Sequence, residues 1–340
     1  MKRLLLLTAF STLTALSFSQ NSQKAVEYMT AVSGEFKAIQ NATWDYTRSV
    51  AKNKSARKVD KNRVELLQTI SNTLTKVKKM GAYDGKTYFR DSTIAFLEMN
   101  KSVVSQDYEK IMNMEEIAEQ SYDLMEAYMK AQEVASEKLS QAGDRINEAE
   151  KKFAAENNIN LIESSDKVSN KLKKAGEMYD YYNPVYLIFF KSYKQELYFM
   201  DALQKGDVSG MEQNKSMLSK TAQEGLDLLK AVNAFKGDES LKKACVDMLT
   251  FYKEEADKKF QVFIDFQSTK ESFDKAKKTM ETKKEKDRTQ EDVNNYNTLV
   301  KEYNKATGDY NNMNTELNNK RNKLIESWNN TSNAFTNRHI

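Results

Sequence analysis

The longest regular hydrophobic pattern lies near the C-terminus, where large side chains recur at intervals of seven residues. Its main positions are Tyr296, Tyr303, Tyr310, Leu317 and Leu324. A seven-residue period places these side chains along one face of an α-helix, as in a coiled coil. Many asparagines lie between them, and asparagine is a mediocre helix former. The pattern therefore predicts a helix over residues 290–335 that needs a packing partner, which we expect to be its own bundle.

Apolar residues at helical spacing predict further helices along the rest of the chain. These helices are expected near residues 22–53, 58–80, 87–132, 135–157, 164–205, 208–233 and 239–287. Turns are expected at Tyr83–Lys86 and Phe235–Asp238, where a glycine can take a positive φ. Asp207 suits the N-cap of the helix that follows it. The single proline, Pro184, either begins a helix capped by Asn183 or kinks a longer helix.

The two halves of the chain resemble each other at a constant separation of 152 residues. Ala82–Gly85 matches Ala234–Gly237, and in the helices that follow Leu97 matches Leu249. Self-similarity at a fixed separation is the signature of an internal repeat. Two amphipathic helices can also resemble each other by chance. We interpret the pattern as a duplication of about 150 residues.

Composition agrees with a fold made of helices. The 340 residues include one proline and ten glycines, which is too few for the frequent turns of a β-rich fold. We therefore predict an all-α fold of two tandem, sequence-related antiparallel bundles with about four helices each, elongated overall. The bundles are expected over residues 20–160 and 161–340, joined near Asn157–Asn160.

The first nineteen residues have the layout of a cleaved secretory signal peptide. The pair Lys2-Arg3 precedes an apolar run over residues 4–18, and the cut is expected after Ser19. Cleavage would lower the formal net charge from +4 to +2, because it removes two cations. No second apolar run reaches the roughly 18 residues of a membrane span. We expect export by the general secretory route to the periplasm or cell surface, with no lipid anchor and no transmembrane span after cleavage.

Residue types that commonly carry catalysis or bind metals are scarce. The single histidine, His339, lies next to the C-terminus, where chains usually fray. The single cysteine, Cys245, lies on an expected helix, where a free cysteine is usually a small buried residue. No glycine-rich phosphate loop occurs, and the carboxylates are expected on solvated faces. We predict no enzyme activity, no catalytic residue, no metal site and no cofactor. The near-neutral charge gives no reason to expect nucleic-acid binding.

Residues 179–199 form the densest aromatic stretch of the chain. Tyr186, Phe190 and Tyr193 recur at helical spacing and share one face of the helix. The first interpretation is a central helix buried between two modules. The second is a groove for a ligand or a partner segment, because tyrosine offers a large contact area and a polar tip. The candidate residues of such a groove are Tyr181, Tyr182, Tyr186 and Tyr193.

The segment Tyr83–Asp91, followed by a long helix ending near Glu148–Asn157, resembles an uncharacterised family of exported, all-helical bacterial proteins labelled as surface proteins. Phe235–Asp238 and the helix after it resemble the same pattern. The shared motif is structural, a glycine turn that leads into a long helix. The resemblance implies export, helical bundles and no assigned activity, and it offers no catalytic residue to carry over.

These observations favour a non-enzymatic exported interaction or structural protein at the cell envelope or surface. Its partner is unknown and includes self-association as one option. The alternative is a helical module that binds a small apolar or aromatic ligand, or a peptide, through the tyrosine-rich helix. An enzyme based on carboxylates or tyrosine is a third hypothesis. The basic stretch over residues 275–288 has acidic residues interleaved, which indicates a solvated helix.

Overall fold

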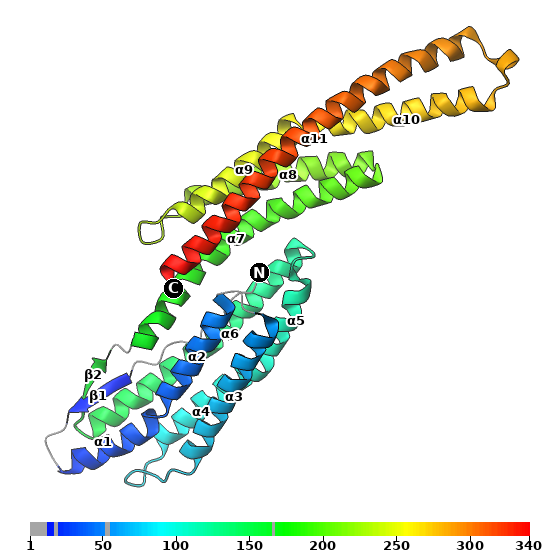
Figure 1. Ribbon diagram of the computed structural model, residues 1–340. Coiled ribbons are helices and arrows are strands. Elements are labelled where there is room, and N and C mark those ends of the chain that lie inside the picture. Colours follow the sequence, from blue (N-terminus) through cyan, green and yellow to red (C-terminus); the bar gives the residue numbers. More distant parts are fainter. Residues whose placement is uncertain (1–11, 17–19, 52–54, 165–166) are drawn as a thin grey trace. The chain divides into compact units, whose positions relative to one another are not determined.

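The computed structural model describes residues 12–16, 20–51, 55–164 and 167–340 (Figure 1). Helices dominate these residues, so the predicted all-α class is confirmed. The chain forms two compact units, residues 1–181 with 338–340 and residues 182–337. The division falls inside one continuous helix, whereas the sequence suggested a join near Asn157–Asn160.

The first unit contains short antiparallel strands and several helices that pack in sequence. These elements are β1 (Thr12–Leu16), α1 (Gln20–Ser33), α2 (Phe36–Ala51), α3 (Ala56–Lys78), α4 (Tyr88–Ser102), a π-helical turn (Val103–Asp107), α5 (Tyr108–Ala118), α6 (Tyr122–Glu156), β2 (Asn160–Ser164) and the start of α7 (Lys167–Lys205). Helix α3 packs between α2 and α4, and α6 covers α4 and α5. Strand β1 pairs with β2, with Thr12 opposite Ser164 and Leu16 opposite Asn160.

The second unit contains the rest of α7 and four further helices of the described chain. These are α8 (Val208–Lys230), α9 (Ser240–Lys258), α10 (Gln261–Thr282) and α11 (Gln290–His339), with a short 3₁₀ turn at Glu285–Asp287. Helix α8 packs closely on its neighbours at Gly225. A Cβ there would lie 2.8 Å from Leu249 Cδ1 and 2.9 Å from Ile188 Cγ2, so only glycine fits without displacing them.

Both units contain the same helix–turn–helix geometry at the separation of 152 residues noted above. Helices α3 and α8 begin and end at positions that correspond one to one, and so do the starts of α4 and α9. Tyr83 bridges to Lys86 in the first unit, as Phe235 bridges to Asp238 in the second. Gly85 and Gly237 both take positive φ angles, of 73° and 85°, a conformation that glycine adopts at no steric cost.

Several predicted helix boundaries are wrong because local breaks interrupt long apolar patterns. The helix expected over residues 22–53 breaks at Gly34, whose N–H bonds Thr30 O at 2.7 Å. The break expected at residues 133–134 lies instead before Ser121, whose hydroxyl accepts a hydrogen bond from Leu124 N as an N-cap. The helix expected over residues 239–287 is divided at Lys259–Phe260. Pro184 lies inside α7, which continues through it.

The core of the second unit is built on aromatic rings. Trp328 of α11 is buried and stacks on Phe189 of α7, with ring centroids 4.3 Å apart. Cys245 is fully buried, as expected, and burial raises the pKa of its thiol. Within the described residues, no helix combines the length and apolar character that crossing a membrane requires.

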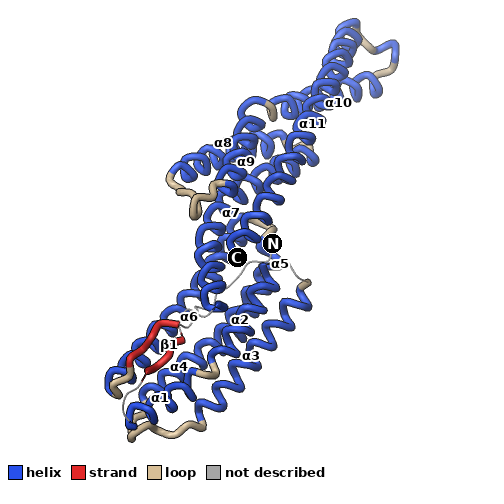
Figure 2. Tube along the Cα trace, turned by 60° about the vertical axis from the view of Figure 1, so that its left-hand side comes forward, coloured by secondary structure: helices blue, strands red, loops and turns tan. Residues whose placement is uncertain are grey.

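A two-helix arm extends from the second unit. The distal part of α10 and the N-terminal half of α11 run side by side beyond the ends of α8 and α9 (Figures 1 and 2). The three tyrosines of the predicted seven-residue seam, Tyr296, Tyr303 and Tyr310, lie inside this arm, whereas Leu317 and Leu324 follow it on α11. Tyr303 stacks on Phe273 with centroids 4.7 Å apart, and Tyr310 packs on Phe266 at 4.6 Å. The seam of α11 therefore finds its partner in the same chain.

Candidate functional site

The strongest concentration of buried charge joins three helices of the second unit. The Arg321 guanidinium of α11 donates hydrogen bonds to Glu196 of α7 and to Glu255 of α9. The Arg321 Nη2–Glu255 Oε2 distance is 3.0 Å. Glu255 is fully buried and Glu196 is 1% exposed, so both carboxyls are removed from water. We call Glu196, Glu255, Arg321 and the adjacent Tyr252 the polar cluster.

In the polar cluster, two carboxyl groups lie against a single cation. This arrangement favours a proton on one of the carboxyls. Burial, and then the charge of Glu196, raise the pKa of Glu255 well above its usual value. Both carboxyls accept hydrogen bonds from the same guanidinium, so two acids share one cation. Burial lowers the pKa of Arg321, but Glu196 and Glu255 outweigh it and raise that pKa overall. The cluster can therefore hold a buried proton next to a fixed guanidinium.

Two atoms of the polar cluster have no hydrogen-bond partner in the described part of the chain, Glu255 Oε1 and Tyr252 Oη. Burial raises the pKa of Tyr252, and the nearby carboxyls raise it further, so this side chain stays a neutral phenol. A buried polar atom without a partner costs about 1–3 kcal/mol. The cluster thus costs free energy that an apolar core would not.

In the first unit, apolar side chains occupy the positions that correspond to the charged residues of the polar cluster of the second unit. Phe153 of α6 packs on Tyr83 at 5.3 Å, as Phe335 of α11 packs on Phe235 at 5.7 Å, which aligns these two helices. When α6 and α11 are aligned at Phe153 and Phe335, Leu139 is the counterpart of Arg321. By the 152-residue correspondence, Trp44 and Val103 are the counterparts of Glu196 and Glu255. Leu139 and Val103 are buried, so the shared architecture closes without ions at these positions.

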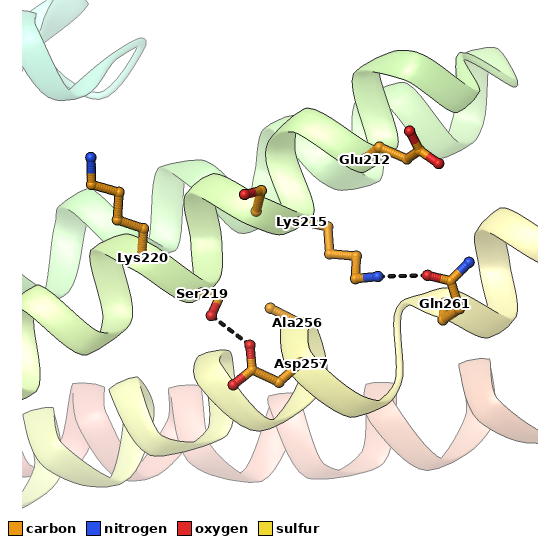
Figure 3. A pocket seen from close by; sticks show the side chains of 8 residues that line it. Glu212, Lys215, Ser219, Lys220, Ala256, Asp257 and Gln261 are labelled. Carbon is orange, nitrogen blue, oxygen red and sulfur yellow. Dashed lines mark hydrogen bonds between the residues drawn. The ribbon is translucent and has the colours of Figure 1, made fainter.

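A polar pocket of about 610 Å³ lies between α8 and the junction of α9 with α10 (Figure 3). Its lining residues are Glu212, Lys215, Ser216, Ser219, Lys220, Ala256, Asp257 and Gln261. Lys215 Nζ donates to Gln261 Oε1 at 2.6 Å, and Ser219 Oγ donates to Asp257 at 2.5 Å. The two bonds tie α8 to the α9–α10 junction.

Both carboxylate oxygens of Asp257 contact other side chains of the protein. Its second oxygen pairs with Lys253 at 2.7 Å. Lys253, and then Ser219, hold the pKa of Asp257 below its usual value. The carboxylate is therefore an ionised structural acceptor at the wall of the pocket.

The four tyrosines predicted as a ligand site are placed within helix α7. Tyr182 and Tyr186 are buried, while Tyr181 and Tyr193 are half-buried. Tyr186 stacks on Phe190 at 5.6 Å and on Tyr182 at 6.1 Å. Tyr193 stacks on Phe189 at 5.6 Å and lies close enough to Tyr252 to affect its pKa. These rings are thus packed against protein side chains, and the ligand groove stays a hypothesis.

The first unit has its own buried carboxyl, Glu150 of α6. This residue is fully buried, and neither of its oxygens has a hydrogen-bond partner among the described residues. Burial alone raises the pKa of Glu150 to about 7. Its counterpart in the helix alignment above is Ser332, so this acid is specific to the first unit.

Sequence reasoning missed the polar cluster because it treated carboxylates as solvated. A signal was available, since Arg321 lies four residues after Leu317 and seven before Trp328, on the buried stripe of α11. Opposite charges on the apolar stripes of separate helices indicate a buried ion cluster. Within the described residues, no group of three or more histidine, cysteine and acidic side chains is arranged to hold a metal ion.

No protein-family model, curated protein or solved structure matches the chain. The resemblance to exported surface proteins therefore stays a prediction.

Proposed function

We propose that this is a non-enzymatic exported interaction or structural protein of the cell envelope or surface, and that its α10–α11 arm makes the contact with a partner. The arm is the observation that carries the proposal. Its aromatic seam packs between two helices of one chain, and its outer faces are polar and exposed along most of their length. A two-helix projection displays surface to another molecule.

The ends of the arm are fixed by specific interactions. At its distal turn, Lys283 pairs with Asp292 at 2.7 Å. Asp292 also accepts from Thr289 N at 2.8 Å, while Thr289 Oγ1 accepts from Asp292 N at 3.1 Å, which caps the start of α11. At its base, Phe263 is buried against Phe199 and Phe260. The arm is therefore held at both ends.

Export and duplication are parts of the same proposal. The signal-peptide pattern of residues 1–19 supports export, although most of it lies outside the described residues. The recurrence of helix bounds and turn angles at a separation of 152 residues supports duplication. On this view the first unit provides the plain bundle, and the second adds the arm.

Site-specific photo-crosslinking in the cell that makes the protein tests the role of the arm. One probe replaces Asn297, which is exposed on α11 within the arm, and the control probe replaces Leu228, which is 59% exposed on α8. We expect a discrete crosslinked species from the arm position and none from the control. Crosslinking from Leu228 alone would move the contact away from the arm. Specific turnover of a substrate by the purified protein would contradict the non-enzymatic assignment.

A further inference from the structure

The aromatic seam of the arm is covered on one side only. Phe266, Phe273, Tyr296, Tyr303 and Tyr310 are all half-buried, although they pack on one another across the two helices. Two helices alone cannot enclose rings of this size, whereas two more helices complete a four-helix core. The seam thus offers an apolar strip along the length of the arm.

The arm also carries an uneven distribution of charge. We call residues 275–292 the tip, and residues 261–274 with 293–316 the base. The tip contains seven cations and five anions, a net charge of +2, and the base contains three cations and six anions, a net charge of −3. Lys278 and Lys284 at the tip and Asp309 at the base have no ion-pair partner in the described chain.

We propose that the arm pairs with the arm of a second copy of this chain, side by side and antiparallel, so that each tip lies on the partner's base. This inference rests on the proposed role of the arm and names its partner. Twofold pairing is the commonest arrangement of homo-oligomers. A parallel pair would place tip on tip and base on base, which opposes like charges. The antiparallel pair matches opposite charges and joins the two aromatic strips into one core.

The contact area is that of a small biological interface. The free part of α10, residues 265–282, is about 27 Å long at 1.5 Å per residue, and two helices side by side are about 20 Å wide. Each arm then contributes roughly 540 Å², and the pair roughly 1,100 Å², which clears the roughly 1,000 Å² required of a biological interface. Such an interface depends on its charges, so high salt should weaken it.

A charge-swap experiment by sedimentation equilibrium tests the pairing. The tip variant carries Lys278→Glu and Lys284→Glu, and the base variant carries Asp265→Lys and Asp309→Lys. All four residues are exposed, so circular dichroism melting should match that of the unchanged chain and show that the variants fold. We expect the unchanged mature chain to sediment as a dimer. Each variant alone should dimerise about tenfold or more weakly, because its tip and base have the same sign.

The decisive sample is the equimolar mixture of the two variants. In a mixed dimer, the negative tip of the tip variant faces the positive base of the base variant. The positive tip of the base variant faces the negative base of the tip variant, so the mixture should recover the dimer. Variants that dimerise alone as well as the unchanged chain would overturn the pairing, and so would a mixture that fails to recover. An unchanged chain that stays monomeric also overturns it. In that case crosslinking from Asn297 to a different protein would leave the proposed function intact.

Discussion

Arg321 is the residue on which the polar core of the second unit depends, because it is the cation that contacts both buried carboxyls. Removing one partner of a buried ion pair is costly, whereas replacing the whole set with apolar side chains is often neutral or stabilising. The first unit contains that replacement naturally, with Val103 and Leu139 buried at two of the corresponding positions. The cluster is therefore retained at a cost in stability.

Arg321→Leu should lower the free energy of unfolding of the second unit by about 3–5 kcal/mol, because two carboxyls are left buried without a cation. Adding Glu196→Leu and Glu255→Val should restore most of the loss. Urea unfolding followed by Trp328 fluorescence measures both, in a Trp44→Phe background that removes the other tryptophan. If the triple variant is as unstable as the single variant, apolar side chains cannot replace the charged residues of the polar cluster in the second unit as they do at the corresponding positions of the first.

Glu150 gives the first unit a distinct dependence on pH. Its pKa is raised to about 7 in the folded protein, above the usual 4.5, so folding favours its protonated form. The stabilising effect of that proton is complete below pH 4.5 and is lost as the pH rises through 7. Glutamine does not titrate, so the Glu150→Gln variant should not lose stability as the pH rises through 7.

The unfolding free energy of the unchanged chain relative to Glu150→Gln should therefore fall by about 2–3 kcal/mol between pH 5 and pH 8. Calorimetry of the full chains at the two pH values measures the change. Ser332→Ala, at the corresponding position of the second unit, is the matched control and should give no such dependence. If the free energies of unfolding of the unchanged chain and of Glu150→Gln differ by the same amount at both pH values, the Glu150 carboxyl is exposed to water in the folded protein.

At the scale of the elements, the sequence predicts helices well where an apolar period ends at a strong turn. Helix α8 begins at residue 208 as expected after Asp207, whose side chain accepts a hydrogen bond from Gly210 N. The missed breaks at Gly34 and Lys259–Phe260 occur where the apolar period continues across the break. Tertiary packing decides such positions, because the local sequence supports a helix on both sides.

Ser121 marks the break that the apolar pattern places wrongly, and it also provides a test. Ser121→Ala removes the hydroxyl that accepts from Leu124 N, and should destabilise the start of α6 by about 1 kcal/mol. Hydrogen exchange of the first turn of α6 measures the effect. Ser136→Ala, inside the same helix, should leave exchange there unchanged or slower, since alanine favours helix. Equal effects of the two variants would contradict the N-cap assignment.

At the scale of the whole molecule, the fold class follows from composition, but the polar cluster does not. Glu196 and Glu255 lie 125 and 66 residues from Arg321 along the chain, so only the packing of α7, α9 and α11 brings them together. The same limit applies to the tyrosines of α7. Their helical spacing, which also brings Phe190 next to Tyr186, was evident, but their contact with Trp328 of α11 is known only from the bundle.

The N-terminal segment makes a separate prediction about the mature protein. Residues 12–16 form β1, which lies within the expected signal peptide and pairs with β2. Protein isolated from its own cells should begin at Gln20 and should lack this pairing. N-terminal sequencing with an intact mass measures the cut. A chain that retains its first residues in the exported compartment would contradict the cleavage and leave β1 as a permanent part of the fold.

If the arm connects this protein to its partner, native mass spectrometry of protein taken gently from its exported compartment should detect that partner. The comparison is with an armless variant in which a short glycine-rich loop replaces residues 267–302. The stacked rings of Phe266 and Tyr303, 5.9 Å apart, mark the point where the two helices can be joined. We expect the intact chain in an assembly with a further chain, and the armless variant as a folded single chain. An armless variant that retains the same assembly, or an intact chain with only a small added ligand mass, would contradict the claim.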